Sequence, residues 1–451
     1  MQESPTLVRP RFLNDRFQKA IILEQPDPSL DDYLLEQGIT PERVPDEETS
    51  DVESVIARLE EGQHDLLYKR SKFPVTEEVL AASPNLAAIM LCCIGDDTVD
   101  KQACAEAGVL VMNDPVSNGR SVVEMVFGEM IGIARRIFTA NEAGRQHLWT
   151  KSSSRRYELL GKTLSIIGLG NIGKQIAKLA DNFGMDICFY DASEVASEVG
   201  EALGWTACNS IEEAFAKGDF VTLHVSAEDP KGRSNQGLIT YDHFKRLAAD
   251  RPENSPRGFI NAARGFLYDP SDLKRAIKEG HVRAAAIDVF PEEPGSSNEE
   301  WQNPYAEVGE VVTTPHIGAA TQEAQPRIAS RIATTTRMFN EHATVRDTVF
   351  APQETIGARV EPPYWALSVV HSDVRGTKKA IDDSVYDAGA SNLNSNHCDF
   401  PEYGIAYDVN ALNEPLSDAQ LNDLVERAVE LSGDPHAIRS IRQFKVNGDQ
   451  A

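Results

Sequence analysis

Short apolar runs alternate with longer amphipathic stretches over the first quarter of the chain. Residues 19–25 (KAIILEQ), 64–71 (HDLLYKRS), 85–95 (NLAAIMLCCIG) and 108–115 (GVLVMNDP) each have the length and apolar character of a buried strand. Amphipathic stretches such as residues 31–39 (DDYLLEQGI) lie between them. Repeated strand–helix units of this kind predict a parallel sheet, so residues 1–117 are expected to form one α/β unit.

A second series of apolar runs begins at residue 163. Each run ends in polar residues or glycine, and the carboxyl ends of parallel strands are where ligands bind in open α/β sheets. Between the two series, residues 121–144 carry apolar positions at helical spacing, with Ser121 placed as a cap and Glu124 three residues later. This pattern predicts one long helix that bridges two domains. The runs cover residues 163–170, 185–192, 219–226, 258–265, 284–290 and 310–318.

The pattern changes once more towards the C-terminus. A helix is expected near residues 321–342, followed by a proline-containing stretch at 352–363 and by alternating strand-like and helix-like segments. The expected fold class is therefore α/β, with two doubly wound parallel-sheet domains and a small C-terminal α+β domain. The expected division is 1–117, 118–318, 319–348, a linker at 349–363, and 364–451.

Composition limits what such a chain does. At 451 residues the chain exceeds what one hydrophobic core supports, and 41% hydrophobic with 25% charged residues is typical of soluble globular proteins. Without an apolar run of about 18 residues or a signal-peptide pattern, we expect a cytoplasmic protein with no membrane contact. The net charge of -26 argues against nucleic-acid binding, and reflects either a salt-rich cytoplasm or simply a solvated acidic surface. Six cysteines without metal-ligand spacing predict reduced thiols and no metal site.

A glycine-rich turn opens the second series. Gly168, Gly170 and Gly173 form a GxGxxG between an apolar strand and a helix, and the next strand ends in Asp191 about 20 residues later, as a Rossmann-like dinucleotide site requires. The glycines let the backbone approach a pyrophosphate at the helix N-terminus. Asp191 accepts hydrogen bonds from ribose hydroxyls and repels a 2′-phosphate. The predicted cofactor is therefore NAD rather than NADP.

Three side chains near later strand ends fit alcohol oxidation by hydride transfer. Histidine titrates near neutral pH and suits the proton acceptor, arginine pairs with a substrate carboxylate through two hydrogen bonds, and a carboxylate orients the histidine. His316, Arg264 and Glu293 are the candidates for these tasks. Each has an ordinary structural interpretation by itself, and only their joint occurrence downstream of the glycine motif favours catalysis.

The motifs GKTLSIIGLGNIG, FYD, INAARG, AAIDVFPEEP and TPHIGAATQEAQ resemble those of the D-2-hydroxyacid dehydrogenase family. Together with YKRS, CCIGDDTVD and SNGRSVVEMV, they are most similar to the phosphoglycerate-oxidising members from bacteria. The resemblance covers residues 19–340 and implies a nucleotide domain (118–318) inserted into a substrate domain (1–117 and 319–348), with the active site in the cleft. It implies that His316 is the general acid/base, Glu293 its partner and Arg264 the carboxylate anchor. Along the NAD it places Gly168, Gly170, Asn171, Ile172, Gly173, Asp191, His224, Ala262, Ala263, Arg264, Asp288, His316, Gly318 and Ala319.

The same resemblance suggests the substrate. A phosphate requires cationic and hydrogen-bonding groups, and Arg70 and Ser71 at a strand end suit this task. The expected reaction is oxidation of D-3-phosphoglycerate, the first step of L-serine biosynthesis. Another D-2-hydroxy acid such as 2-hydroxyglutarate uses the same catalytic residues, and an NAD-binding corepressor-like scaffold is the alternative from another class. The candidate substrate residues are Arg70, Ser71, Gly95, Asn118, Lys151 and Arg264.

Residues 364–451 are similar to an ACT-type regulatory domain, which implies L-serine as an effector. His371 and Gly376 match that pattern, whereas Asp373, Arg375 and Ser391 replace its usual Asn, Pro and Asn. The domain is therefore either an effector-binding module or an assembly module without a ligand. The resemblance also implies a homodimer or homotetramer.

Overall fold

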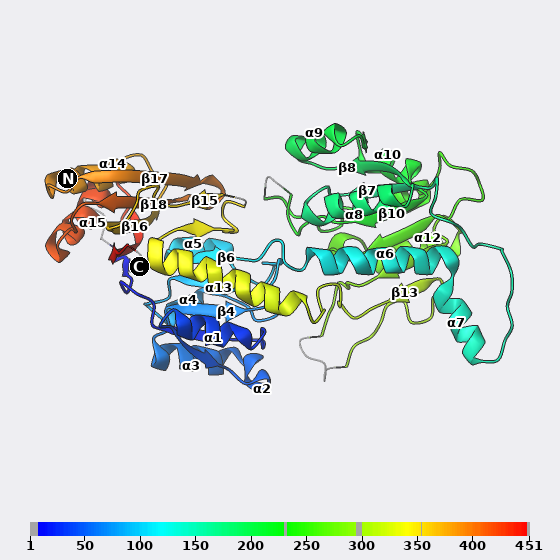
Figure 1. Cartoon of the computed structure of the whole chain (residues 1–451), viewed down its shortest axis with the longest axis horizontal. Coiled ribbons are helices and arrows are strands. Elements are labelled where there is room, and N and C mark those ends of the chain that lie inside the picture. The colour runs from blue at the N-terminus through cyan, green and yellow to red at the C-terminus, as the bar shows by residue number, and fades with distance from the viewer. Residues whose placement is uncertain (1–7, 230–231, 295–299, 353, 449–451) are drawn as a thin grey trace. The chain divides into compact units, whose positions relative to one another are not determined.

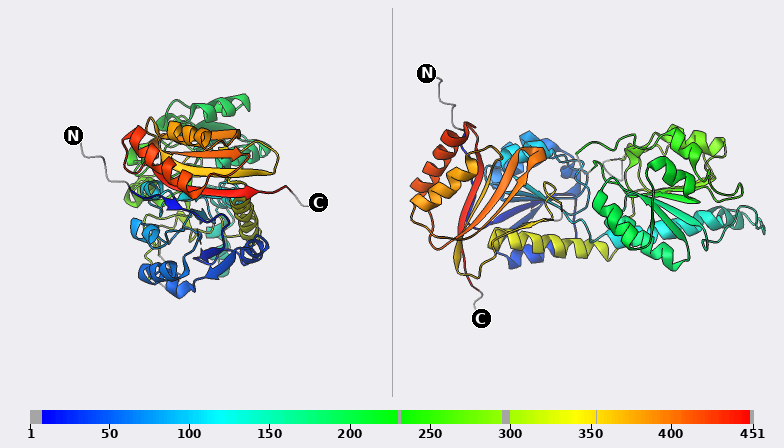
Figure 2. Two further views of the ribbon diagram at one scale, coloured as in Figure 1. Left: turned by 90° about the vertical axis from the view of Figure 1, so that its left-hand side faces the viewer. Right: turned by 90° about the horizontal axis from the view of Figure 1, so that it is seen from above.

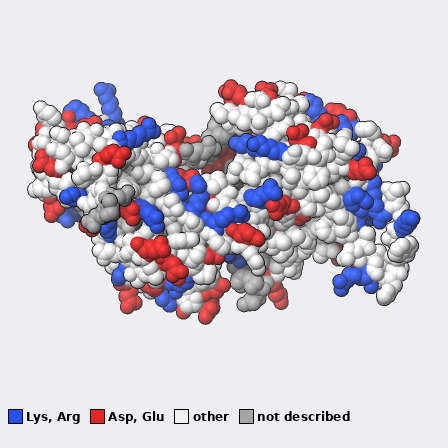
Figure 3. Space-filling view, in the orientation of Figure 1, with Lys and Arg blue, Asp and Glu red and all other residues white. Residues whose placement is uncertain are grey.

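The computed structural model describes residues 8–229, 232–294, 300–352 and 354–448. The chain separates into two compact units, one made of residues 1–115 and 325–451 and the other of residues 116–324. They are called unit 1 and unit 2 below, and each is described by itself. None of the described helices combines the length and the apolar composition needed to cross a bilayer. Acidic and basic side chains are interspersed on the face drawn in Figure 3.

Unit 2 is built on a seven-stranded parallel sheet in the order β13-β12-β11-β10-β7-β8-β9 (Figure 1). The direction in which the chain adds strands reverses between β7 and β10, and ligands of doubly wound sheets bind at such a switch point. The strands are β7 (Thr163–Ile167), β8 (Asp186–Tyr190), β9 (Thr206–Ala207), β10 (Phe220–Leu223), β11 (Gly258–Asn261), β12 (Ala284–Ile287) and β13 (Val311–Thr313).

Helices cover both faces of this sheet because its strands are apolar on both sides. Adjacent residues point to opposite faces, so Phe259 joins one core with α10, α11 and α12, whereas Ile260 joins the other core with α6 and α8. The helices are α6 (Gly119–Arg135), α7 (Ile137–Arg145), α8 (Asn171–Asn182), α9 (Glu194–Ala202), α10 (Ile211–Lys217), α11 (Tyr241–Arg246) and α12 (Pro270–Lys278), with a 3₁₀ turn at Gly265–Leu267.

Unit 1 contains a five-stranded parallel sheet in the order β3-β2-β4-β5-β6. Its strands are β2 (Lys19–Ile22), β3 (Thr40–Arg43), β4 (Leu66–Lys69), β5 (Ala88–Leu91) and β6 (Leu110–Met112). Its helices are α1 (Ser29–Glu36), α2 (Asp46–Thr49), α3 (Val52–Gly62), α4 (Glu77–Ala81), α5 (Lys101–Ala107) and α13 (Ala324–His342). The parallel sheets predicted from the two series of apolar runs are therefore both present.

The C-terminal segment of unit 1 forms a second sheet in the order β1-β19-β16-β18-β17, antiparallel except for β1. Figure 2 shows helices α14 and α15 on one face of this sheet, and their apolar residues form a core with Leu367, Val369 and Leu412. Alternate residues on the opposite face join the core of the parallel sheet. The elements are β1 (Arg11–Phe12), β16 (Tyr364–Ser372), α14 (Thr377–Asp387), β17 (Asn392–Phe400), a 3₁₀ turn (Pro401–Tyr403), β18 (Ile405–Leu412), α15 (Asp418–Ser432) and β19 (Ile438–Val446).

The structure differs from the pattern-based expectation at several elements. The long helix begins at Gly119, so Ser121 does not cap it, and Arg136 in a left-handed conformation separates α6 from α7. Instead, the Ser121 hydroxyl contacts that of Thr321 at 2.9 Å. In the expected linker, β15 (Thr355–Ile356) pairs with β14 (Val345–Arg346).

Strand β17 was missed because its sequence, NLNSNHCDF, is rich in Asn and Asp, residues that are rare in strands. It lies at the edge of its sheet and pairs only with β18 among the described strands, so its other edge has no strand partner there. Pairing with a neighbour, rather than intrinsic preference, therefore accounts for this strand.

A buried arginine joins the segments of unit 1. Arg442 on β19 is 1% exposed and donates to the carbonyl oxygens of Asn14, Asp15, Phe339 and Asn340 at 2.8–3.0 Å. Its guanidinium also lies 3.9 Å from the ring centroid of Phe17. The N-terminal segment, α13 and the C-terminal sheet therefore meet at one charged group.

Replacing this group is expected to destabilise the protein. The substitution Arg442→Met leaves several buried carbonyl oxygens without donors, which costs about 3 kcal/mol or more of unfolding free energy. Urea denaturation followed by circular dichroism measures the loss. Arg427→Ala is the matched control, since Arg427 forms one ion pair with Asp387 near the surface and its loss costs under about 1 kcal/mol. Equal stability of the two variants would contradict the role given to Arg442.

Candidate active site

The glycine-rich turn follows β7 at the switch point of the unit 2 sheet. Gly168 has a φ of 95°, and a Cβ atom there would lie 2.5 Å from the carbonyl oxygen of His224. A Cβ atom on Gly173 would lie 2.2 Å from the carbonyl oxygen of Gly168. A side chain at either position would collide with backbone atoms, so the fold of the turn itself requires both glycines.

Gly170 is different. Nothing lies within 4 Å of a Cβ atom built there, and its φ of -70° suits other residues. Gly170 is the N-cap of α8, so no cap side chain covers the first turn of this helix, whose N-terminus carries a partial positive charge. The space beside Gly170 and the helix N-terminus behind it fit the approach of a pyrophosphate to the backbone.

Asp191 follows β8 and is held against the same turn. Its carboxylate accepts hydrogen bonds from the backbone N–H of Leu169 at 2.6 Å and from that of Ser193 at 2.8 Å. The side chain is half-buried. Its position is thus fixed beside the glycine turn by two backbone donors, and each carboxylate oxygen retains a second lone pair for a hydroxyl donor.

His316 and Glu293 form a close pair. Nδ1 of His316 lies 2.7 Å from Oε2 of Glu293, and Oε1 of that carboxylate accepts a hydrogen bond from the N–H of Phe290 at 3.0 Å. The hydrogen bond to Glu293 raises the pKa of His316 above its ordinary value, partly opposed by burial and by the charge of Arg264. His316 has a φ of 53°, an uncommon conformation for a non-glycine residue. The contact leaves Nε2 as the ring nitrogen available for proton exchange.

Asp288 accounts for the conformation of His316. Its buried carboxylate accepts hydrogen bonds from the Thr314 hydroxyl at 2.6 Å and from the N–H groups of Ile317 and Gly318, both at 2.9 Å. The carbonyl oxygen of Asp288 accepts from the N–H of His316 at 2.8 Å. Four donors from one short segment therefore converge on Asp288 and bend the backbone around it.

Glu129 on α6 is a buried carboxyl group near the site, one that the sequence did not predict. Burial, with the charge of Asp288 as a smaller cause, raises the pKa of Glu129 to about 7. The Thr314 hydroxyl lies 3.4 Å from its Oε1. A glutamate among apolar residues at helical spacing was the available sequence signal, although nothing in the sequence indicated what it would contact.

Arg264 and His224 follow two further strands at the same edge of the sheet. Asn261 accepts from the N–H of Ala263 at 3.0 Å and donates to the carbonyl oxygen of Arg264 at 2.9 Å, which fixes the backbone after β11. Nε2 of His224 contacts the Thr222 hydroxyl at 2.8 Å, and burial lowers the pKa of His224 to about 3. His224 is therefore neutral at physiological pH, unlike a histidine paired with a carboxylate.

The candidate residues are divided between the two units, three in unit 1 and all the others in unit 2. Arg70, Ser71 and Gly95 lie in unit 1, where the Glu24 carboxylate accepts hydrogen bonds from the N–H groups of Arg70, Lys72 and Phe73. This organising role of Glu24 was not predicted. Asn118, the N-cap of α6, and the exposed Lys151 lie in unit 2. The other candidates all follow the carboxyl ends of unit 2 strands, namely Gly168, Gly170, Asn171, Ile172, Gly173, Asp191, His224, Ala262, Ala263, Arg264, Asp288, Glu293, His316, Gly318 and Ala319.

A doubly wound sheet with a glycine-rich turn at its switch point is the architecture of a dinucleotide-binding domain. Residues 127–318 match the NAD-binding domain of the D-isomer-specific 2-hydroxyacid dehydrogenases. D-3-phosphoglycerate dehydrogenase of Haemophilus influenzae is 37% identical over 64% of this chain and 67% of its own. D-3-phosphoglycerate dehydrogenase 2 of Saccharomyces cerevisiae is 32% identical over 80% of this chain and 76% of its own. The chain belongs to the D-2-hydroxyacid dehydrogenase family.

A solved structure of a family protein from a Polaromonas species supports the fold. It superimposes with a TM-score of 0.61 and 22% identity over 72% of this chain and 97% of its own. The prediction of NAD as cofactor and of an oxidoreductase is confirmed by the family to which the chain belongs.

The two glycines provide a test of the cofactor site. Gly170→Ala is expected to leave the unfolding free energy unchanged and to weaken NAD binding about tenfold or more, because its methyl group occupies the space for the pyrophosphate. Gly168→Ala should instead cost about 1 kcal/mol or more of stability through strain at positive φ. Calorimetric titration with NAD and thermal denaturation separate these effects. Full NAD affinity in the Gly170 variant would disprove the assignment.

Proposed function

We propose that this enzyme oxidises D-3-phosphoglycerate to 3-phosphohydroxypyruvate with NAD, as the first step of L-serine biosynthesis. The observation that carries the proposal is the 2.7 Å pair of His316 and Glu293, which lies within electrostatic reach of Arg264. Relatives whose names state this activity add support for the substrate. Catalytic roles for His316, Glu293 and Arg264 are part of the proposal.

The proposed chemistry follows from the state of each group. Arg264 binds the substrate carboxylate through paired hydrogen bonds and so orients the adjacent hydroxyl-bearing carbon. Neutral His316 accepts the hydroxyl proton at Nε2. NAD held at Gly170 and Asp191 would supply the acceptor for the hydride lost from that carbon. Glu293 holds Nδ1–H, fixes the tautomer and stabilises the imidazolium that results. The substrate loses one hydride and one proton, which leaves a 2-oxo acid.

The remaining candidate residues have proposed binding roles. Asp191 holds the ribose hydroxyls, and Gly170 leaves room for the pyrophosphate on the turn that Gly168 and Gly173 form. Asp288 orients the segment that carries His316. Asn171, Ile172, His224, Ala262, Ala263, Gly318 and Ala319 line the cofactor. For the substrate, Arg70, Ser71 and Lys151 provide the hydrogen bonds and positive charge that a phosphate needs, with Gly95 and Asn118 beside it.

The domain roles complete the proposal. We assign residues 1–117 and 319–348 to substrate binding, 118–318 to NAD binding, 349–363 to a linker and 364–451 to an ACT-like domain. The order β16-α14-β17-β18-α15-β19 supports the last assignment. L-serine is the proposed effector, and a homodimer or homotetramer the proposed assembly.

A substrate panel tests the reaction. We expect NADH formation with D-3-phosphoglycerate at a kcat/KM well above that with D-2-hydroxyglutarate or D-lactate. His316→Ala should lower kcat by about 10²–10⁴-fold while NAD affinity persists, because only proton transfer is lost. A preference for 2-hydroxyglutarate would replace the proposed substrate, and full activity of the variant would overturn the mechanism.

The pH dependence tests Glu293. Oxidation requires neutral His316, so kcat/KM should rise as the pH increases through the raised pKa of His316. Glu293→Gln removes the largest cause of the raised pKa of His316, so the inflection in the kcat/KM profile should move to lower pH. Glu292→Gln is the matched control, since the Trp301 ring N–H donates to the backbone carbonyl oxygen of Glu292, which this substitution keeps. An unmoved inflection in the Glu293 variant would show that this pair does not set the profile.

A further inference from the structure

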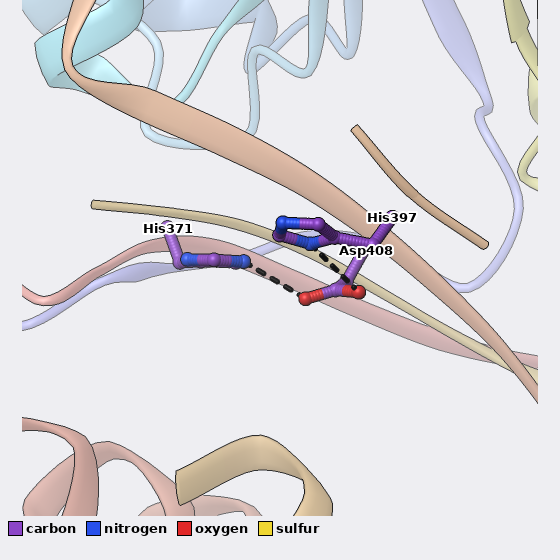
Figure 4. Close-up of side chains that lie close together, drawn as sticks. All are labelled: His371, His397 and Asp408. Carbon is purple, nitrogen blue, oxygen red and sulfur yellow. Dashed lines mark hydrogen bonds and ion pairs between the residues drawn. The ribbon is translucent and has the colours of Figure 1, made fainter. Parts of the chain in front are cut away.

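Three side chains of the C-terminal sheet converge on one point. His371 on β16, His397 on β17 and Asp408 on β18 offer ligand atoms that all lie within 4.8 Å of one another (Figure 4). His397 is directly opposite Asp408 in the strand pairing, and His371 is opposite Ala406, so the three side chains share a face of the sheet. Alternation along paired strands thus produces a cluster from positions far apart in the chain.

The distances suit one metal ion. Nε2 of His371 lies 2.8 Å from Oδ2 of Asp408, and Nδ1 of His397 lies 3.3 Å from Oδ1. Two ligand atoms of a tetrahedral zinc ion, each about 2.0–2.1 Å from the metal, are about 3.3 Å apart. All three ligand atoms lie within 4.8 Å of one another, so side-chain rotation would have to bring them closer to reach coordination distance.

The second nitrogen of each histidine is already engaged. Nδ1 of His371 donates to the carbonyl oxygen of Ser372 at 2.8 Å, which leaves Nε2 of a neutral ring as an acceptor facing a carboxylate. Nε2 of His397 contacts Oδ1 of Asp399 at 2.7 Å, which leaves Nδ1 facing Asp408. Metal-binding histidines are held by a carbonyl or carboxylate in this manner.

The carboxylate at the centre is incompletely satisfied. Asp408 is fully buried, and its Oδ1 contacts Nδ1 of His397 at 3.3 Å and Nζ of Lys378 at 3.6 Å, both longer than an ordinary hydrogen bond. The positive charge of Lys378 would repel a metal ion bound at this oxygen. Lys378 also pairs with Asp382 on the same helix and can keep that ion pair when the metal ion binds. A buried carboxylate is stabilised by compensating positive charge, and a bound cation would supply a closer partner than the contacts with His397 and Lys378.

We propose that His371, His397 and Asp408 form a binding site for a divalent transition-metal ion of the zinc type. Two imidazole nitrogens and one carboxylate oxygen match the ligand preference of Zn²⁺ and leave a coordination position for water or a small ligand. His371 and Asp408 are buried, whereas the His397 side chain is 32% exposed, so the ion enters on the His397 side. Cysteine spacing, on which the prediction of no metal site rested, carries no signal for such a site.

Metal content measured on the untagged full-length protein tests this proposal. The chelator-treated protein is dialysed against Zn²⁺ and its metal content determined, and Co²⁺ is used in parallel for its visible absorption. We expect one ion per chain and a higher thermal denaturation temperature with Zn²⁺. No bound ion at 100-fold molar excess, or bound ions without any thermal shift, would overturn the proposal.

Variants locate the ion. His397→Ala, at a half-exposed edge position, should weaken binding by more than about 100-fold, and Asp399→Asn, which only supports His397, by about 10–100-fold. His281→Ala is the matched control, because His281 lies 3.5 Å from one glutamate, Glu279, and should bind Zn²⁺ like the unchanged protein. Circular dichroism verifies that each variant is folded. Unchanged binding in the His397 variant, or equal loss in the His281 variant, would place the ion elsewhere and disprove the site.

Discussion

The buried carboxylate of Asp288 is the constraint on which the candidate active site depends. A charged group inside the protein needs hydrogen-bond donors, and the nearest ones are the backbone N–H groups of Ile317 and Gly318 and the hydroxyl of Thr314. Because these donors all bond to one carboxylate, the segment after β13 forms a tight bend. His316 takes up a left-handed conformation within this bend, where it reaches Glu293. The hydrogen bonds that stabilise the charge of Asp288 therefore also set the geometry of the His316–Glu293 pair.

The same requirement recurs in unit 1 with other partners. Arg442 is surrounded by carbonyl oxygens and aromatic rings, and Glu24 by the N–H groups of the loop after β4. In each case a single buried or half-buried charge collects polar groups from several segments. The Asp408 cluster differs because its Oδ1 has only two long contacts, with His397 and Lys378, and the proposed ion would be a closer partner.

The glycine motif combines two kinds of requirement within six residues. Gly168 and Gly173 are needed because the turn packs against the carbonyl oxygens of His224 and Gly168 itself, so a side chain at either position would collide with backbone. Gly170 is needed only if something outside the protein comes close. The motif therefore reports on both folding and binding, and the structure separates the two at the level of single residues.

Much of this protein could be predicted from sequence because hydrophobic period and glycine position are local properties. The two parallel sheets, the position of the cofactor turn and the strand-end locations of Arg264, Glu293 and His316 all follow from patterns of a few residues. Tertiary structure alone decided the rest, since it depends on which distant groups share a buried space. The edge strand β17, the support of His316 by Asp288, the raised pKa of Glu129 and the meeting of His371, His397 and Asp408 arise from pairing between segments. Contacts between such distant segments cannot be predicted from periodicity in the sequence, because packing and not spacing along the chain determines the partners of a buried polar group.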